Sequence, residues 1–332
     1  MIENILERIN FLLKKANYET LALGNFAPKK NRFCFDLLVR KDDLIFSVKI
    51  FPNIDNINPN IIRDIKSLSA ILKSKPLLIG IRNRYQKLED NTIYIREDLP
   101  FITLKTFENI LDDKYPHILA RRGGGVVFLD GNLMKILRED HSITRKELAE
   151  KLGVTKRTLC AYENESMRPS ETIAEKILEI LENNDLFKKI NIFGWPVKID
   201  KENILIIEEE ELSEFETHIQ DIIKDIGISS YWYKKGPIPF KLSLYSSSDK
   251  IDTKGFYPLF SGISDNQDKM NEKSFKCLKM FTDLFHKTSL FIIDNDIKIP
   301  EIFKKEKIPI VKIKNLEKVD DEEEFIDLIQ ES

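Results

Sequence analysis

TRKELAEKLGVTKRTLCAYENESMRPSETIAEKILEIL, residues 144–181, is the stretch around which the remaining sequence is arranged. Within it, Leu148, Ala149 and Leu152 recur at the spacing of an amphipathic helix. Gly153 follows at once and ends that helix, because glycine adopts a positive φ without a Cβ penalty. The stretch therefore begins with one short helix and a tight turn.

A second helix is expected directly after this turn. Thr155 is a suitable N-cap, because its hydroxyl can accept a backbone N–H from the first turn of the helix. Leu159 and Tyr162 give the new helix an apolar face that can pack on the first one. The sequence thus predicts a helix-turn-helix (HTH) motif whose second helix runs from Thr155 to Glu163.

This motif resembles the Cro and phage-repressor family of HTH domains, also called the XRE type, over about Leu129 to Leu181. The resemblance is carried by TRKELAEKLGVT and by the closing YENE. It implies an all-α, lambda-repressor-like domain that binds double-stranded DNA with its second helix in the major groove. In the family's pattern, residues at four positions face the bases, here Arg145, Lys156, Arg157 and Ala161. Residues at three others hold phosphates, here Thr155, Asn164 and Arg168, and Thr158 in the first helical turn can reach either.

One residue departs from the family's pattern. Glu165 stands where the family usually carries the glycine that ends the second helix. A carboxylate there lies near the expected path of the phosphates and could weaken nonspecific affinity. Because the same fold also occurs in bundles that only mediate protein contacts, an antitoxin or assembly factor with a protein partner is an alternative.

The composition indicates a globular protein of two to three domains, with 332 residues of which 42% are hydrophobic and 32% are charged. Its formal net charge is −3, so attraction to DNA must come from a local positive surface. No stretch approaches the ~18 apolar residues of a membrane span, and Cys34, Cys160 and Cys277 form no CxxC pair. We therefore expect a cytoplasmic protein that binds no metal, cofactor or membrane.

Three domains are expected, at residues 1–122, 123–189 and 190–332. The first has the order helix, hairpin, helix, strand, strand, helix, which indicates an α/β domain. It ends before Gly123 to Gly125, since glycines in series suggest a hinge or a turn. The last domain repeats the order of the first: KSKPLLIGI corresponds to HKTSLFIID, and FCFDLLV to FKLSLYS. We therefore favour a divergent duplication of one α/β domain.

The first domain resembles the PD-(D/E)xK nuclease fold, which is of the restriction-endonuclease type. Asp36 lies on one strand of the expected hairpin, and Ser47 to Lys49 lie on its partner. A working site needs two carboxylates to hold Mg²⁺ and a lysine to poise the attacking water, but the second acid is here a serine. We therefore expect an inactive domain in which Asp36 and Lys49 either form a cross-strand charge pair or are two solvated side chains. In the last domain, the corresponding positions are expected to be Ser243 and Gly262.

Two further sets of residues could meet nucleic acid. YWYKKGPIPFKLSLY, residues 231–245, could stack on single strands, but a strand with aromatic side chains in the core is the favoured interpretation. Basic residues near turns of the first domain could add phosphate contacts, although such charges are more often only solvated, and these are Lys29, Lys30, Arg32, Arg82 and Arg84.

Together these patterns predict a sequence-specific transcriptional regulator that is not an enzyme. The three-part layout also resembles a group of archaeal HTH-type transcriptional regulators of similar length. Because tight binding normally needs two HTH domains on half-sites ~34 Å apart, we expect a homodimer assembled through the flanking domains. The alternative function is a Mg²⁺-dependent nuclease that the HTH targets, with Asp36 and Lys49 in its site. The flanking domains could host a small-molecule effector, although no set of residues identifies a pocket.

Overall fold

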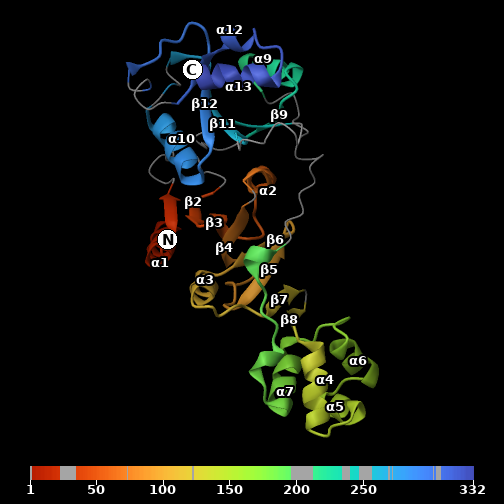
Figure 1. The fold of residues 1–332 in the computed structure, drawn as a ribbon. Helices are drawn as coiled ribbons and strands as arrows, with labels where there is room; N and C mark the ends of the chain where they lie inside the picture. The colour runs from red at the N-terminus through yellow and green to blue at the C-terminus, as the bar shows by residue number, and fades with distance from the viewer. Residues whose placement is uncertain are drawn as a thin grey trace.

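The computed structural model consists of two α/β domains and one helical domain (Figure 1). It describes residues 2–22, 35–72, 74–121, 123–195, 212–233, 240–246, 256–267, 270, 272–301, 303 and 308–332. The helical domain follows the first sheet along the chain and lies at the far end of the molecule from the second sheet.

The first domain is built on an eight-stranded sheet of order β1-β2-β3-β4-β6-β5-β7-β8. Its strands are β1 Glu19–Ala22, β2 Leu37–Lys41, β3 Leu44–Asn53, β4 Lys75–Arg82, β5 Thr92–Arg96, β6 Leu99–Ile102, β7 Ile118–Arg121 and β8 Gly124–Val127. Its helices are α1 Ile2–Lys15, α2 Pro59–Ile71 and α3 Leu104–Leu111. Along β3, Val48 and Ile50 pack with α1 and α3, whereas Phe51 packs with α2. Both faces of the sheet are covered, as its mostly apolar central strands require.

The second α/β domain repeats this topology with a five-stranded sheet of order β13-β12-β11-β10-β9. Its strands are β9 Ser229–Trp232, β10 Leu242–Tyr245, β11 Leu259–Ser264, β12 Thr288–Ile293 and β13 Ile310–Lys312. Its helices are α9 Glu214–Asp225, α10 Glu272–Phe285, α12 Ile313–Leu316 and α13 Glu322–Glu331. In each sheet two antiparallel pairings precede two parallel ones, and one helix crosses over between the third and fourth strands. This shared order agrees with the expected duplication.

The strand registers fix which residues of the two domains correspond. The backbone N–H of Asp36 donates to Val48 O (2.7 Å), and that of Lys241 donates to Ser261 O (2.8 Å). Lys241 is therefore the counterpart of Asp36, and Gly262 is the counterpart of Lys49. The sequence-based pairing of Asp36 with Ser243 was wrong by two residues. A shift of two residues keeps every side chain on the same face of a strand, so the apolar pattern alone could not detect it.

The glycine-rich segment forms a hairpin and not a hinge. β7 and β8 pair antiparallel, and Gly123 lies in the turn between them. The expected domain boundary after residue 122 falls within this hairpin, which is the outer edge of the first sheet.

The two α/β domains share one hydrophobic core. It joins buried residues of α2, such as Ile65 and Leu68, with buried residues of α10, such as Leu278 and Phe281. Both helices lie in the layer between the two sheets (Figure 1). The remaining helices cover the outer face of their own sheet, so that each domain presents its α2 or α10 face to the other.

A buried polar contact crosses this shared core. The Tyr231 hydroxyl of β9 donates a 2.9 Å hydrogen bond to Asp64 Oδ1 of α2. Both side chains are buried. At the counterpart positions on β1 and α10, Leu21 and Cys277 belong to the same apolar cluster. One side of the duplicated interface is thus held by a hydrogen bond and the other by apolar packing.

Tyr231→Phe is expected to lower the free energy of unfolding by about 1–3 kcal/mol, because it leaves the buried Asp64 carboxylate without this donor. Urea denaturation followed by circular dichroism measures the change. Tyr85→Phe is the matched control, since Tyr85 is 83% exposed and should change stability by less than about 0.5 kcal/mol. Equal stability of the two variants would show that the contact does not support the interface.

Candidate nucleic-acid interface

The helical domain is a compact bundle. In the sequence it follows the β7–β8 hairpin and precedes the second α/β domain. Its core contains Met134, Leu148, Leu159 and Ile177, one from each of its four α-helices. The elements are α4 Gly131–Asp140, α5 Arg145–Leu152, α6 Lys156–Glu163 and α7 Glu171–Leu181, followed by the short 3₁₀ helices η1 Asn184–Leu186 and η2 Ile192–Gly194.

Local hydrogen bonds set the α5–turn–α6 geometry as the sequence predicted. Thr144 and Glu147 form a capping box at the start of α5. Gly153 ends α5 with φ +70°. This conformation is strained for residues that have a Cβ atom and is unstrained for glycine. The Thr155 hydroxyl accepts from the backbone N–H of Thr158 at 3.1 Å and so caps α6. The start of the second motif helix is therefore fixed by the Thr155 side chain.

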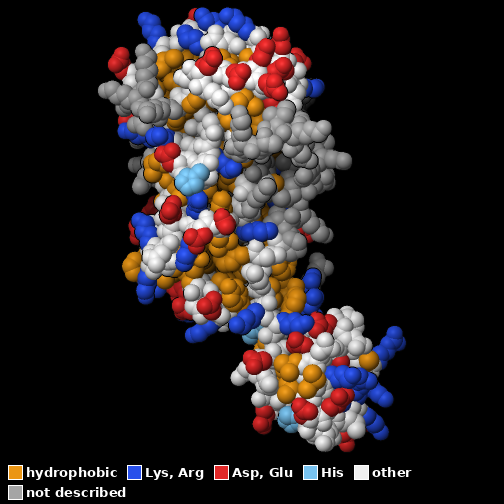
Figure 2. Space-filling model, in the orientation of Figure 1, with side chains coloured by type: hydrophobic (Ala, Val, Ile, Leu, Met, Phe, Trp, Pro, Cys, Tyr) orange, Lys and Arg blue, Asp and Glu red, His pale blue; other side chains and the backbone are white. Residues whose placement is uncertain are grey.

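The predicted base-reading cations lie on the exposed first turn of α6. Lys156 and Arg157 are exposed, and neither forms an ion pair with any residue that the structure describes. Figure 2 shows Lys and Arg side chains on the outer side of the bundle, in the region of α6. Thr158 and Ala161 are half-buried on the same helix, and Asn164 is exposed at its end. This surface offers free positive charge on a preformed helix.

Arg145 occupies a more constrained place than the sequence suggested. Its Nε donates to Glu163 Oε2 at 2.7 Å, while Arg138 Nε donates to Glu163 Oε1 at 2.6 Å. The Glu163 carboxylate raises the pKa of the Arg145 guanidinium through this hydrogen bond. Arg145 is 37% exposed, and among the described residues its two Nη groups have no partner. Any base contact of Arg145 must therefore come from these Nη groups.

Arg138 and Glu163 are residues that sequence reasoning missed. Their side chains are only 6% and 2% exposed, so the pair ties α4 to the end of α6 inside the bundle. A charged residue on each of two helices was visible in the sequence. Nothing local indicated that the two meet, because they lie 25 positions apart.

Glu165 adopts the conformation of the glycine that it replaces, with φ +57°. Its carboxylate accepts from Lys188 Nζ at 2.6 Å and from the backbone N–H of Gly131 at 3.2 Å. The Lys188 hydrogen bond holds the pKa of Glu165 below its ordinary value. The negative charge that the sequence placed near the phosphates is therefore paired with a lysine, which reduces its repulsion of DNA.

The loop after α6 is fastened to the first sheet. The guanidinium of Arg168 stacks on the Phe128 ring, with Cζ 3.8 Å from the ring centroid. The backbone N–H of Val127, at the end of β8, donates to Pro169 O at 3.0 Å. Stacking limits the freedom of the Arg168 side chain, a predicted phosphate ligand, before any ligand arrives.

The nuclease-like site of the first domain is closed by an ion pair. Lys49 Nζ lies 2.9 Å from Asp36 Oδ1, and the backbone N–H of Ile50 donates to Asp36 Oδ2 at 2.8 Å. The Lys49 side chain is 4% exposed, and Ser47 beside it is buried. Of the two arrangements expected for Asp36 and Lys49, the structure shows the charge pair and not two solvated side chains. In the described ranges no group of three or more His, Cys, Asp or Glu residues could hold a metal ion.

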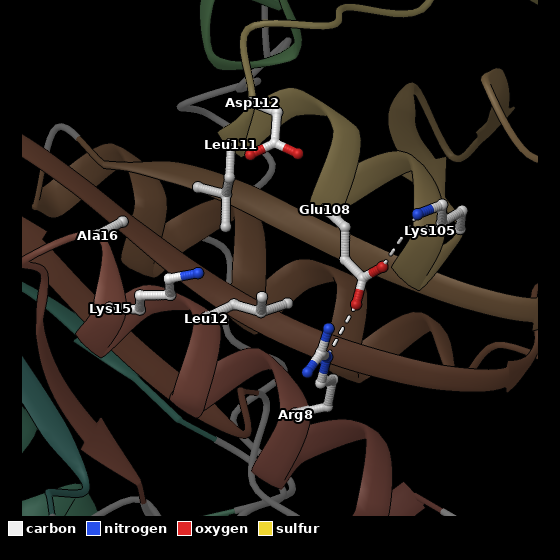
Figure 3. A pocket seen from close by; sticks show the side chains of 8 residues that line it. All are labelled: Arg8, Leu12, Lys15, Ala16, Lys105, Glu108, Leu111 and Asp112. Atoms are coloured by element: carbon white, nitrogen blue, oxygen red, sulfur yellow. Dashed lines mark hydrogen bonds and ion pairs between the residues drawn. The ribbon is translucent and has the colours of Figure 1, made fainter.

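A surface pocket of about 360 Å³ lies between α1 and α3 (Figure 3). Three of its charged side chains pair with one another, since Glu108 accepts from Arg8 at 2.9 Å and from Lys105 at 3.4 Å. These cations hold the pKa of the Glu108 carboxyl below its usual range. The other two charged residues of the lining, Lys15 and Asp112, are of opposite sign, and no arrangement of side chains in the pocket indicates a particular ligand.

Some of the residues considered for nucleic-acid contacts fall outside the described residues, namely Lys29, Lys30, Arg32 and residues 234–239. In the rest of the aromatic segment, Tyr231, Tyr233 and Phe240 are buried in the shared core. The interpretation of these aromatic side chains as core residues is thereby confirmed. Across the described ranges, the helices are too short or too polar to cross a membrane.

Known protein families match two parts of this chain, the first α/β domain and the helical domain. A family model described as a PD-(D/E)XK superfamily domain matches residues 2–116, and one described as helix-turn-helix matches residues 134–184. A Methanobrevibacter smithii protein named "Putative HTH-type transcriptional regulatory protein" is 33% identical over 98% of this chain and 96% of its own length. An Archaeoglobus fulgidus protein of the same name is 30% identical, over 100% and 98% of the two chains. No solved structure matches the chain.

Proposed function

Because the chain belongs to this family of archaeal HTH-type transcriptional regulatory proteins, we propose that it regulates transcription by binding double-stranded DNA at specific sequences. The observation that carries the proposal is the pair of cations Lys156 and Arg157 on the first turn of α6, which are exposed and form no ion pair among the residues that the structure describes. Cations on the N-terminal turn of a recognition helix can reach base edges in the major groove. The protein then acts in the cytoplasm, where archaeal DNA lies.

The proposed DNA contacts are of two kinds: contacts to bases, which select the sequence, and contacts to phosphates, which position the protein on the duplex. Arg157 suits a bidentate contact with guanine O6 and N7, and Lys156 can reach the same edge from the neighbouring position. Arg168, stacked on Phe128, and the exposed Asn164 amide hold phosphates and fix the register of α6 on the duplex. The Thr155 hydroxyl caps α6, so its phosphate contact comes through the exposed side of the same oxygen.

We further propose that two chains bind together on a pair of half-sites. Each chain carries one HTH motif, and a single motif binds weakly. The α2 and α10 faces are already used between the two α/β domains of one chain, so pairing of chains must involve other surfaces. Sedimentation of the protein with a selected duplex tests this: two chains per duplex are expected, and a complex of one chain would refute the homodimer.

The nuclease-like domain, in this proposal, is a scaffold and not a catalyst. A serine cannot replace the second carboxylate ligand of Mg²⁺, and both oxygens of Asp36 already have partners. We expect no cleavage of plasmid DNA by the purified chain with Mg²⁺ or Mn²⁺. Cleavage that disappears in Asp36→Ala would instead establish the nuclease alternative.

A further inference from the structure

An exposed basic turn links β4 to β5. The basic turn comprises residues 82–87, with the sequence Arg-Asn-Arg-Tyr-Gln-Lys. Arg82, Arg84 and Lys87 are exposed, and Tyr85 between them is 83% exposed. Within the described chain, Arg84 and Lys87 form no ion pair. The turn therefore presents positive charge and an exposed aromatic ring side by side to the solvent.

The basic turn is held in one shape by hydrogen bonds beneath it. Asn83 Oδ1 accepts from the backbone N–H groups of Tyr85 (2.8 Å) and Gln86 (2.7 Å). Asp55 Oδ2 accepts from the backbone N–H of Arg84 at 2.8 Å, and Asp55 Oδ1 pairs with Arg96 Nε at 2.6 Å. Because the backbone is fixed, the cationic side chains project outward from a constant position.

The direction of the strands places the basic turn at the HTH end of the first sheet. β4 and β6 run parallel, and β5 runs antiparallel to β6, so β4 ends where β5 begins. β7 runs parallel to β5 and starts at this same end, and β8, antiparallel to β7, finishes there. Val127 of β8 is bonded to the loop after α6 at Pro169. The basic turn and the phosphate-binding loop of the HTH thus lie at one end of the sheet.

A second observation brings the basic turn close to α7. Glu89, two residues beyond the turn, donates its backbone N–H to the Tyr94 hydroxyl at 3.0 Å. Burial raises the pKa of the Glu171 carboxyl at the start of α7, and the negative charges of Glu175 and Glu89 raise it further. Glu89 therefore lies near Glu171, the first residue of α7. Glu171 is only three positions after Arg168 in the sequence. Glu89 and Glu171 are acidic, so favourable contacts with a duplex at this end of the sheet would have to come from the exposed cations Arg84 and Lys87.

We propose that the basic turn is a second DNA-contact surface, which binds the phosphate backbone of the duplex flanking the sequence read by α6. Arg84 and Lys87 each neutralise a phosphate, and the Tyr85 ring lies against the sugar between them. The inference rests on the proposed function. It assigns the nuclease-like domain a role in holding flanking DNA that needs no catalytic site.

Binding to duplexes of two lengths tests this surface by fluorescence anisotropy. A short duplex carries only the selected half-site, and two longer duplexes extend it by about 10 bp, roughly one helical turn, one on each side. The wild-type chain should gain about tenfold in affinity from the extension on one side. Arg84→Glu/Lys87→Glu should lose this gain, and the slope of log K against log salt should fall by about two.

The matched control is Lys314→Glu/Lys318→Glu, which makes the same change of net charge on and beside α12, at the far end of the molecule from the HTH domain (Figure 1). Arg84→Gln/Lys87→Gln separates lost contacts from added repulsion and should show most of the same loss. Equal length dependence in the basic-turn variants and the control would overturn the inference while leaving the proposed function intact. Failure of the wild-type chain to bind either duplex would overturn both.

Discussion

Lys156→Ala/Arg157→Ala is expected to raise the dissociation constant for the selected DNA about 100-fold or more. Each good contact to a base edge discriminates by about 1–3 kcal/mol, and this variant removes two of them. Both side chains are exposed and outside the core, so the folded state should keep its stability. Fluorescence anisotropy at fixed salt, on selected and scrambled duplexes, measures the change.

The loss of affinity on the selected duplex, compared with that on the scrambled duplex, distinguishes base reading from nonspecific electrostatic attraction. Lys135→Ala/Lys176→Ala removes the same charge from exposed positions on α4 and α7 of the same domain. This control should weaken binding to both duplexes slightly and equally, whereas the α6 variant should lose chiefly its preference for the selected duplex. A uniform loss in both variants would mean that α6 does not read sequence.

Glu163→Gln is expected to destabilise the helical domain by about 3 kcal/mol. The change leaves the guanidinium of Arg138, only 6% exposed, without its buried carboxylate partner, and removal of one member of a buried pair typically costs 3–5 kcal/mol. Arg145 is more than a third exposed and screened by water, so it should add little to the loss. The Glu163 carboxylate also accepts from Arg145, a predicted base-contact residue, and so restrains its side chain.

Hydrogen exchange of α5 and α6 amides measures this loss within the domain, so that the α/β domains do not mask it. Glu139→Gln is the control, since Glu139 pairs with the same Arg138 at 3.1 Å but is 55% exposed. It should cost less than about 1 kcal/mol. Equal protection in the two variants would show that the buried network does not stabilise the bundle.

The HTH motif was predictable because its determinants are local. The apolar spacing of Leu148 and Leu152, the turn at Gly153 and the cap at Thr155 all act within a few residues. The sequence was likewise sufficient to assign the predicted DNA-contact residues to positions on the motif. The partners of Arg145 and Glu165 could not, because they come from α6 and from the segment after η1, far away in sequence.

The α/β domains were predicted in outline and missed in detail. Strands β1, β5 and β9 have only four or five residues, too few to display a period, and their pairing is decided by neighbours in the sheet. The shared core between the domains was also invisible. Apolar faces on α2 and α10 fit a helix packed on its own sheet as well as one packed between two sheets.

Selection of bound fragments from sheared genomic DNA tests the central claim most directly. The purified chain is incubated with the fragments at near-physiological salt, and Lys156→Ala/Arg157→Ala is treated in parallel. Enrichment of a short palindromic sequence by the wild-type chain, lost in the variant, is the result that the proposed function predicts. Salt-sensitive retention without sequence preference, or no retention at all, would contradict it.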